Sequence, residues 1–234
     1  MPTAVITGAS RGLGLALARA LAERGWGLVV DARGGGALAS VAHELGRITR
    51  VIAVAGDVAD PGHRDALVGA AQQLGGLDLL VNNASILGPS PQPSLRDYPL
   101  DVLAAVFDVN VHAPLALVQR ALALLEASAG RIINITSDAA VEGYEGWGGY
   151  GASKAALEQL SRVLAVEHPA LRVYWVDPGD MNTQMHQEAF PGEDISDRPP
   201  PEQSVPGLME LITGDLPSGR YTTRELAATE VTDL

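Results

Sequence analysis

The sequence predicts an α/β protein, a Rossmann-like doubly wound parallel sheet with helices on both faces, formed by a single domain over residues 1–234. Short apolar segments alternate with helical segments along most of the chain, which is the pattern of repeated βαβ units. The strand segments are apolar at successive positions, as expected for strands that are covered on both faces. A glycine-rich turn follows the first strand. In such folds ligands bind beyond the carboxyl ends of the strands.

The elements follow one another in this order. Strands are expected at 3–7, 27–30, 50–55, 77–81, 131–136, 171–176 and 219–222. Helices are expected from the glycine-rich turn to about 24, in a weak pattern ending near 46, and at 61–74, 99–126, 150–168 and 204–213. Proline-rich loops are expected at 88–93 and 190–206. This places a cofactor half at about 1–137 and a substrate loop at about 180–206.

Composition excludes several classes of function. The chain of 234 residues is 47% hydrophobic and has a net charge of −12, which argues against nucleic acid or an anionic membrane as a partner. It has no cysteine, and its five histidines do not stand at metal-ligand spacing, so no metal site is expected. No apolar run approaches the length of a membrane span, and the chain opens on a strand rather than a signal peptide. We therefore expect a cytoplasmic enzyme.

Tyr150 and Lys154 stand four residues apart on a predicted helix, so they share one face of it. A free phenol has a pKa of about 10, and a nearby ammonium lowers that pKa enough to make tyrosine a usable acid or base. Ser137 ends the predicted strand before this helix, where its hydroxyl could hold a substrate oxygen. Tyr-x-x-x-Lys alone is more often a surface pair on an amphipathic helix, so the rest of the chain decides the interpretation.

The turn Gly8–Gly14 lies between a strand and a helix, which is the arrangement of a phosphate site. Glycine lets the backbone approach the ligand, and the helix N-terminus supplies free N–H groups. Gly8, Ser10 and Gly12 also match Gly-x-Ser-x-Gly, the nucleophile elbow of serine hydrolases. The hydrolase interpretation is weak, because no earlier loop is present to complete an oxyanion hole.

These motifs together resemble the short-chain dehydrogenase/reductase family over nearly the whole chain. The residues that carry the resemblance are Thr7-Gly8-Ala9-Ser10-Arg11-Gly12-Leu13-Gly14, Asn82-Asn83-Ala84, Asn110, Ser137, Tyr150, Lys154, Pro178-Gly179 and Thr183. The resemblance implies an oxidoreductase that interconverts a carbonyl and an alcohol with a nicotinamide cofactor. It also implies a homodimer or homotetramer, often formed through the helices at 99–126 and 150–168.

The resemblance implies a role for each matching residue. Tyr150 would be the acid–base group, Lys154 would touch the cofactor ribose and lower the tyrosine pKa, and Ser137 would orient the carbonyl. Asn110 would complete the catalytic set. The residues implied in cofactor binding are Gly8, Ser10, Arg11, Gly12, Leu13, Gly14, Arg33, Asp57, Val58, Asn83, Ala84, Tyr150, Lys154, Pro178, Gly179, Met181 and Thr183.

The chain departs from the family pattern at two places. Ser85 stands where glycine is common, and the tail after Gly219 lacks the usual glycine-rich ending, which weakens the expectation of the usual tetramer contacts. In the family, the carbonyl of the residue at Asn110 holds a water on the proton path. Pro114 follows four residues later and has no N–H, so we hypothesise that it frees this carbonyl; an incidental kink is the alternative.

NADP(H) is favoured as the cofactor, with NAD(H) as the alternative. Arg11 and Arg33 stand where NADP-preferring members carry basic residues, and arginine gives a charge-assisted fork to a phosphate. Ala32 occupies the position of the discriminating acid. Asp31 ends the second strand and could instead hold a free ribose hydroxyl.

The predicted function is therefore NADP(H)-dependent interconversion of a small-molecule carbonyl and its alcohol, with a dinucleotide-binding sensor of the same fold as the alternative. The walls of the substrate site are expected from residues 138–149, 87–95 and 185–206. Tyr144, Trp147, Met185 and Phe190 would make it apolar or aromatic, unless they only pack the core.

Overall fold

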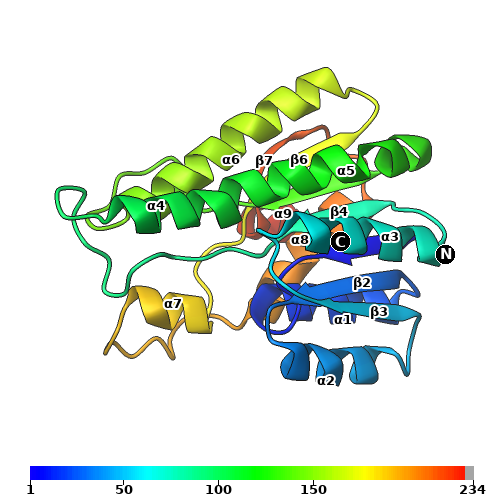
Figure 1. Ribbon diagram of the computed structural model, residues 1–234, viewed down its shortest axis with the longest axis horizontal. Coiled ribbons are helices and arrows are strands. Elements are labelled where there is room, and N and C mark those ends of the chain that lie inside the picture. The colour runs from blue at the N-terminus through cyan, green and yellow to red at the C-terminus, as the bar shows by residue number, and fades with distance from the viewer. Residues whose placement is uncertain (230–234) are drawn as a thin grey trace.

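A seven-stranded, entirely parallel sheet forms the centre of the computed structural model, which describes residues 1–229 (Figure 1). The strands are β1 (Thr3–Ile6), β2 (Gly27–Ala32), β3 (Val51–Ala55), β4 (Leu79–Asn82), β5 (Arg131–Ile135), β6 (Arg172–Asp177) and β7 (Gly219–Thr222). The helices are α1 (Gly12–Glu23), α2 (Gly35–Leu45), α3 (Pro61–Leu74), α4 (Leu100–Phe107), α5 (Ala113–Ser128), α6 (Gly148–Glu167), α7 (Gln184–Ala189), α8 (Val205–Thr213) and α9 (Thr223–Thr229). A π-helical turn, η1 (Asp108–His112), and two 3-10 turns, η2 (Asp138–Ala140) and η3 (Pro201–Ser204), complete the set.

The strand order is β3-β2-β1-β4-β5-β6-β7, so the chain winds outward from β1 in one direction and then from β4 in the other. Helices cover both faces. Ile6 and Val30 point into a core with α1, α2 and α8, while Val5 and Val29 point into a second core with α3 and α5. Alternate residues of one strand are therefore buried on opposite faces, which explains the uninterrupted apolar runs of the sequence. The switch in winding direction between β1 and β4 opens a crevice for ligands.

Local sequence signals set some of the helix ends. The Asp60 carboxylate caps α3 by accepting from the backbone N–H groups of Gly62 at 2.6 Å and His63 at 3.2 Å. Pro61 occupies the first turn, where its missing N–H costs nothing, and Gly75 ends the helix with φ +112°, a left-handed conformation that glycine favours. The predicted helix at 61–74 is accordingly confirmed.

The predicted long helix at 99–126 is confirmed as one helical segment, Leu100–Ser128, which contains a π-helical turn. The π-helical turn η1 separates α4 from α5, and the Ala113 N–H donates to the Asp108 carbonyl, five residues earlier. Pro114 lies at the second position of α5 and has no N–H, so the regular i to i−4 ladder cannot run through this point. The π-helical turn includes Asn110, as the proline suggested, whereas the proposed water at its carbonyl stays a prediction.

Two helices were not expected from the sequence, α7 and α9. The α7 helix has six residues and α9 seven, too few for helical periodicity to stand out. Residues 190–206 form the expected loop except for the turn η3 at its end, and the predicted helix at 204–213 and strand at 219–222 are both confirmed.

One helical segment is long and apolar enough to span a membrane, by length and composition only. The helical segment Leu100–Ser128 has 29 residues and a mean hydropathy of 1.5 over its best window, and 39% of that window is buried inside the protein. Val106, Leu117 and Leu125 of this segment are core residues. Such a core helix passes the same test as a membrane span, so the segment is weak support for a membrane location.

Candidate active site

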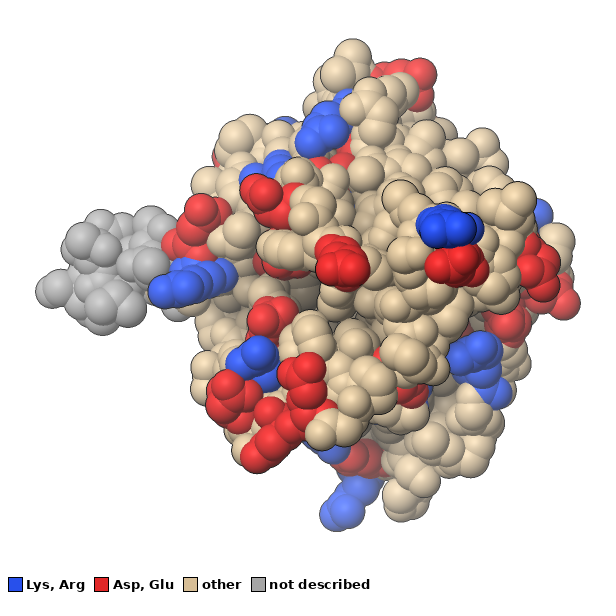
Figure 2. All heavy atoms as spheres, turned by 90° about the vertical axis from the view of Figure 1, so that its left-hand side faces the viewer, with Lys and Arg blue, Asp and Glu red and all other residues tan. Residues whose placement is uncertain are grey.

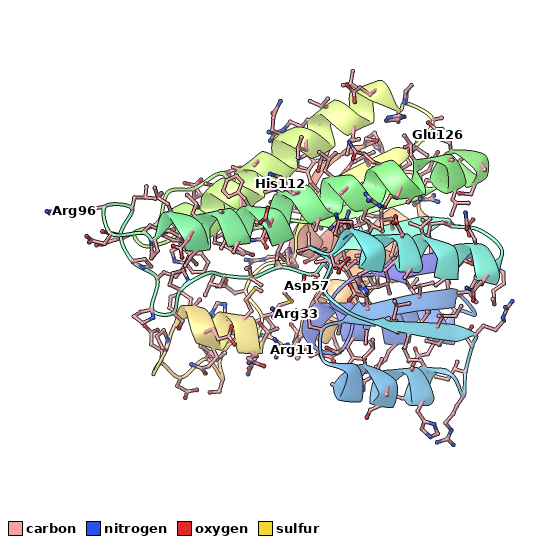
Figure 3. The ribbon with its side chains drawn as sticks, in the orientation of Figure 1. Arg11, Arg33, Asp57, Arg96, His112 and Glu126 are labelled. Atoms are coloured by element: carbon pink, nitrogen blue, oxygen red, sulfur yellow. The ribbon has the colours of Figure 1, made fainter. Side chains whose placement is uncertain are left out.

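A cavity of about 840 Å³ opens at the carboxyl ends of the strands. Its lining comes from the turn after β1, the ends of β2 to β6, and α7. Arg11, Arg33 and Asp57 lie close together where the cavity passes between α7 and the strands (Figure 3). Figure 2 shows the end of the molecule that includes α7, where acidic side chains gather on part of the surface. The volume is within the range of cofactor and substrate sites.

The glycine-rich turn is built for close backbone approach. Gly8 has φ +68°, and a Cβ atom there would lie 3.0 Å from the Ala84 Cα. At Gly14 a Cβ would lie 2.5 Å from the Gly8 carbonyl oxygen, closer than real side chains come. Helix α1, which begins in this turn, has neither a side-chain cap nor an acidic residue in its first turn. Its positive end therefore lies at the cavity without a competing anion, which fits the pyrophosphate of a dinucleotide.

Asn83 and Thr7 fasten this turn to the loop after β4. The Asn83 side chain donates to the carbonyls of Thr7 at 2.8 Å and Gly8 at 3.2 Å. In return, the Thr7 hydroxyl oxygen accepts from the N–H groups of Asn83 and Ala84, both at 3.0 Å. Asn83 thus positions the turn while its backbone lines the cavity.

The two arginines and Asp31 take different positions at the end of β2. Arg33 is exposed at the cavity, and Arg11 donates to the Gln184 side chain of α7. The Asp31 side chain is buried, and its Oδ1 lies 3.4 Å from His63 Nε2, a contact too poorly aligned to count as a hydrogen bond. Burial raises the pKa of Asp31 to about 7, with Asp57 adding to the rise. Asp31 also lines the cavity, and its Oδ2 has no hydrogen-bond partner among the described residues.

Ser137 follows β5 and begins the turn η2. Its hydroxyl donates to Asp138 Oδ1 at 2.8 Å, and its oxygen accepts from the Ala139 N–H at 3.2 Å. The Asp138 carboxylate also accepts from the Tyr144 hydroxyl at 3.0 Å. A hydroxyl rotates easily, so Ser137 can exchange Asp138 for a substrate oxygen.

Tyr150 reaches the same cavity from the first turn of α6 and is 8% exposed. Glycines on either side allow the helix to come this close. A Cβ at Gly151 would lie 2.5 Å from the Ala139 carbonyl oxygen, and one at Gly149 would lie 2.3 Å from the Tyr98 ring. The ring also meets Trp147 edge-on, with centroids 5.8 Å apart. Glycine at these positions therefore brings the phenol next to the turn that begins at Ser137.

Lys154 is the only lysine in the sequence, and the other permanently charged basic side chains are arginines. It is 2% exposed, its Nζ donates to the Ile135 carbonyl at 2.8 Å, and the same atom lies 5.4 Å from the centroid of the Tyr150 ring. Burial lowers the pKa of this ammonium to about 7. Lysine can lose its proton in such a place, whereas arginine cannot.

The pKa of Tyr150 is raised, not lowered as expected from its lysine neighbour. Burial is the main cause, and the carboxylates of Asp177 and Asp138 add to it, while a hydrogen bond with Ser85 opposes it. The Lys154 ammonium lies 5.4 Å from the ring centroid and donates its hydrogen bond to the Ile135 carbonyl instead of to the phenol. The phenol is consequently protonated at neutral pH.

Asn110 lies in η1 and is 1% exposed. Its Oδ1 accepts from the Ile86 N–H and its Nδ2 donates to the Ile86 carbonyl, both at 2.9 Å. The same Nδ2 donates to Ser153 Oγ at 3.0 Å, and that hydroxyl donates to the Tyr150 carbonyl at 2.6 Å. Its side chain therefore holds the loop after β4 against the turn of α6 that carries Tyr150.

Most of the predicted site residues meet at the cavity, and three do not line it. Those that line it are Gly8, Ser10, Arg11, Gly12, Leu13, Arg33, Asp57, Val58, Asn83, Ala84, Ser137, Tyr150, Pro178, Gly179, Met181 and Thr183. Gly14, Asn110 and Lys154 lie behind this lining, Gly14 against the Gly8 carbonyl and the other two in the contacts described above. Among the described residues, no group of His, Asp and Glu side chains could hold a metal ion.

Sequence reasoning placed Asp138 only in a wall of the substrate site and gave Asp177 no role there, although both are acids at the cavity. Both line the cavity and both raise the pKa of Tyr150. Asp177 is the last residue of β6, and its Oδ1 accepts from the Gly179 N–H at 2.9 Å. The sequence did contain a signal for both acids. Asp138 directly follows Ser137 and Asp177 directly precedes Pro178, so each lies at the carboxyl end of a predicted strand, where ligands bind.

An apolar wall faces Tyr150. Leu87, Trp147, Met185 and Ala189 pack around it from the loop after β4, the start of α6, and α7. Phe190 extends this wall, with its ring centroid 6.0 Å from that of Trp147. Of the four residues expected to make the site apolar or aromatic, Trp147 and Met185 line the cavity, Phe190 packs behind Trp147, and Tyr144 donates its hydroxyl to Asp138.

Comparisons with known proteins give relatives over almost the same length. A benzil reductase ((S)-benzoin forming) of Saccharomyces cerevisiae is 35% identical over 218 residues, covering 89% of this chain and 80% of the relative. A short chain dehydrogenase of Pseudomonas syringae has a solved structure that superposes with a TM-score of 0.89 at 30% identity, covering 95% of this chain and 94% of that one. A short chain dehydrogenase of Shigella flexneri, solved in complex with NADP, gives a TM-score of 0.86 at 29% identity over 95% of this chain and 97% of that one.

The family model described as short chain dehydrogenase matches residues 2–194. The match covers the glycine-rich turn, the strand ends and the helix of Tyr150, which are the parts that build the cavity. The chain belongs to the short chain dehydrogenase family, whose members are oxidoreductases that use a nicotinamide dinucleotide.

Proposed function

We propose that this protein is an NADP(H)-dependent oxidoreductase that interconverts a carbonyl and an alcohol. The observation that carries the proposal is the convergence of Ser137 and Tyr150 on one cavity with Lys154 directly behind them. The cofactor half at about 1–137 would supply the dinucleotide site and the loop at about 180–206 would close the substrate side. A protein that only senses a dinucleotide has no chemical need for this set.

In the reducing direction Ser137 Oγ would turn from Asp138 and donate to the carbonyl oxygen, which fixes the substrate. The bound cofactor supplies the hydride that the carbonyl carbon receives. Tyr150 Oη would give its proton to the oxygen as negative charge develops there. Because burial keeps this phenol protonated, it is ready as a proton donor at neutral pH. Lys154 would then stabilise the phenolate that remains.

The positions of the charged side chains support NADP(H) over NAD(H). Arg11 and Arg33 lie at the cavity near the end of β2, where a 2′-phosphate would be placed, and Ala32 offers no acid there. Asp31 also lines the cavity, but its carboxyl is buried and lies 3.4 Å from His63 Nε2, so the exposed Arg33 is the more accessible group for a ribose substituent. The Shigella flexneri relative binds NADP, which is in line with this preference.

The apolar wall supports a substrate with an aromatic or bulky apolar group next to its carbonyl. Trp147, packed against Phe190, offers an aromatic ring to the cavity, and Met185 offers an adaptable thioether. The yeast relative is named for the reduction of benzil, an aromatic diketone, so such diketones are the first candidates. We further propose a cytoplasmic homodimer or homotetramer, assembled through α4, α5 and α6.

The test is oxidation of NADPH and NADH by the full chain over a panel of aldehydes, ketones and diketones that includes benzil. Tyr150→Phe is run beside the parent, because it removes the hydroxyl and keeps the ring. We expect turnover with NADPH that Tyr150→Phe lowers by about a hundredfold or more. Tight NADPH binding without Tyr150-dependent turnover on any compound would favour the sensor alternative, and esterase activity lost in Ser10→Ala would favour a hydrolase.

A further inference from the structure

A cluster of charged side chains surrounds one buried carboxylate next to the backbone of Ser137. Its centre is Glu158 of α6, which is 1% exposed and stands one helical turn beyond Lys154. Arg220 of β7 donates from Nε to Glu158 Oε1 at 2.9 Å, and Thr136 donates from its hydroxyl to the same oxygen at 3.0 Å. Arg162 donates to the other oxygen, Oε2, at 3.0 Å.

Arg220 also contacts two residues of the active site, Ser137 and Asp177. Its Nη2 donates to the backbone carbonyl of Ser137 at 3.3 Å and lies 3.6 Å from Asp177 Oδ2. One guanidinium thus joins the ends of β5 and β6 to the middle of α6. The planar fork of arginine suits these divergent acceptors, which a lysine could not all reach.

We propose that Arg220 is a positioning residue of the active site: it fixes the backbone of Ser137 and offsets the negative charge of Asp177 beside Tyr150. The proposal deepens the proposed function and rests on it, because it assigns to Ser137 and Tyr150 the roles given above. Arg220 lies beyond residues 2–194, the part matched by the family model, and comes from the last strand.

Two physical effects follow from the geometry. Ser137 must present its hydroxyl to a substrate within a narrow tolerance, and the grip of Arg220 on its carbonyl limits rotation of that peptide unit. The charge effect acts through Asp177. Burial raises the pKa of this carboxyl while Arg220 opposes the rise, so the two form a partly compensated pair. Without the cation, the carboxylate would disfavour the Tyr150 phenolate more strongly.

Other charged side chains surround Arg220 and Asp177, and the variants of the test leave them unchanged. Asp138 follows β5 and acts on both Tyr150 and Asp177, and Asp180 follows β6 and acts on Asp177. Lys154 approaches Tyr150 from the same helix, and His186 of α7 lies 3.9 Å from Asp180. Among the described groups that act on Asp177, Arg220 is the one that favours its charged form by its own positive charge.

The experiment compares Arg220→Gln with Arg162→Gln in the full chain. Both variants remove one partner of the buried Glu158, so both should lower the melting temperature by about 3–8 °C. Arg162 touches neither Ser137 nor Asp177, which makes it the matched control. The alcohol that the parent oxidises fastest is then assayed with NADP⁺ across pH. Oxidation needs the Tyr150 phenolate, so the fall of the rate at low pH, the acid limb of the pH profile, reports the pKa of Tyr150.

For Arg220→Gln we expect kcat to fall by about tenfold and the acid limb to move to higher pH by about half a unit or more. Arg162→Gln should keep the parent's kcat and acid limb. Asp177→Asn in the parent background should move the limb to lower pH, which provides an independent readout if Arg220→Gln does not fold. Adding Asp177→Asn to Arg220→Gln should return the limb towards that of the parent.

Equal pH profiles of the parent, Arg220→Gln and Asp177→Asn would overturn the proposal and leave only a structural role for Arg220. The same shift in Arg162→Gln would also overturn it, because the effect would then arise from Glu158. Neither result touches the proposed function as long as Tyr150→Phe abolishes turnover. No turnover by the parent on any compound would overturn both.

Discussion

Replacing Lys154 by methionine should make the cofactor-free protein more stable while it abolishes turnover. Methionine fills a similar volume without a charge, and the lysine ammonium is held in the core at 2% exposure. Its pKa is about 7 in the folded protein, whereas the ordinary value for an exposed lysine is 10.5. The charged form of Lys154 therefore destabilises the folded state relative to the unfolded state.

The two pKa values give the magnitude. They differ by about 3.5, and at about 1.4 kcal/mol for each pH unit this is a cost of about 5 kcal/mol below pH 7. Methionine also loses the hydrogen bond from Nζ to the Ile135 carbonyl at 2.8 Å, worth about 1.5–3 kcal/mol for a charged donor. The net gain at pH 6 is about 2–3 kcal/mol, which for a chain of this length is a rise in melting temperature of about 4–12 °C.

The pH dependence of the stability gain tests whether the buried ammonium of Lys154 is its cause. Because the folded-state pKa is depressed, the cost is complete below pH 7 and declines as the pH rises towards 10.5. Between pH 6 and pH 9 the stability cost of the Lys154 ammonium falls by about 3 kcal/mol, which corresponds to about 2 pH units. Melting temperatures of Lys154→Met and the parent should therefore differ at pH 6 and nearly coincide at pH 9.

A direct measurement is also available because the chain has one lysine. Protein labelled with ¹³C at the lysine ε-carbon should give one side-chain NMR signal, and its titration midpoint should be about 7 without cofactor. A midpoint of about 10, or a Lys154→Met variant whose stability gain is the same at pH 6 and pH 9, would refute the reasoning.

Three further outcomes are expected. Arg33→Ala should raise the KM for NADPH by about tenfold and leave that for NADH unchanged, since only NADPH carries the 2′-phosphate; an equal effect on both cofactors would contradict the assignment. Asp31→Asn should raise the melting temperature at pH 8 and not at pH 4, because the folded-state pKa of about 7 lies above the ordinary 3.8 and burial of the carboxylate costs stability above pH 7; a gain of the same size at pH 4 would argue against this cause. Pro114→Ala should lower kcat and alter its pH profile if the proline frees the Asn110 carbonyl for a water, and unchanged kinetics would leave only a kink.

Sequence patterns identified much of the site because its chemistry depends on local spacing. Tyr150 and Lys154 are a helical turn apart whatever surrounds them, and the turn Gly8–Gly14 is recognisable from its place between a strand and a helix. Asn110 was found by its motif, but its contacts with Ile86 and Ser153 join segments that no local pattern connects.

The sequence by itself determined the alternation of strands and helices, the burial of both sheet faces and the set of groups available for proton transfer. Only the tertiary structure decided what those groups experience. It buries Asp31 beside His63, which raises the pKa of that carboxyl, and it raises the pKa of Tyr150 where the tyrosine–lysine spacing predicted a lower one. It also brings Arg220 of the last strand to the carbonyl of Ser137. The physical reason is that desolvation and charge coupling depend on distances between segments far apart in the chain, whereas periodicity and motif spacing report only neighbours within a turn or a strand.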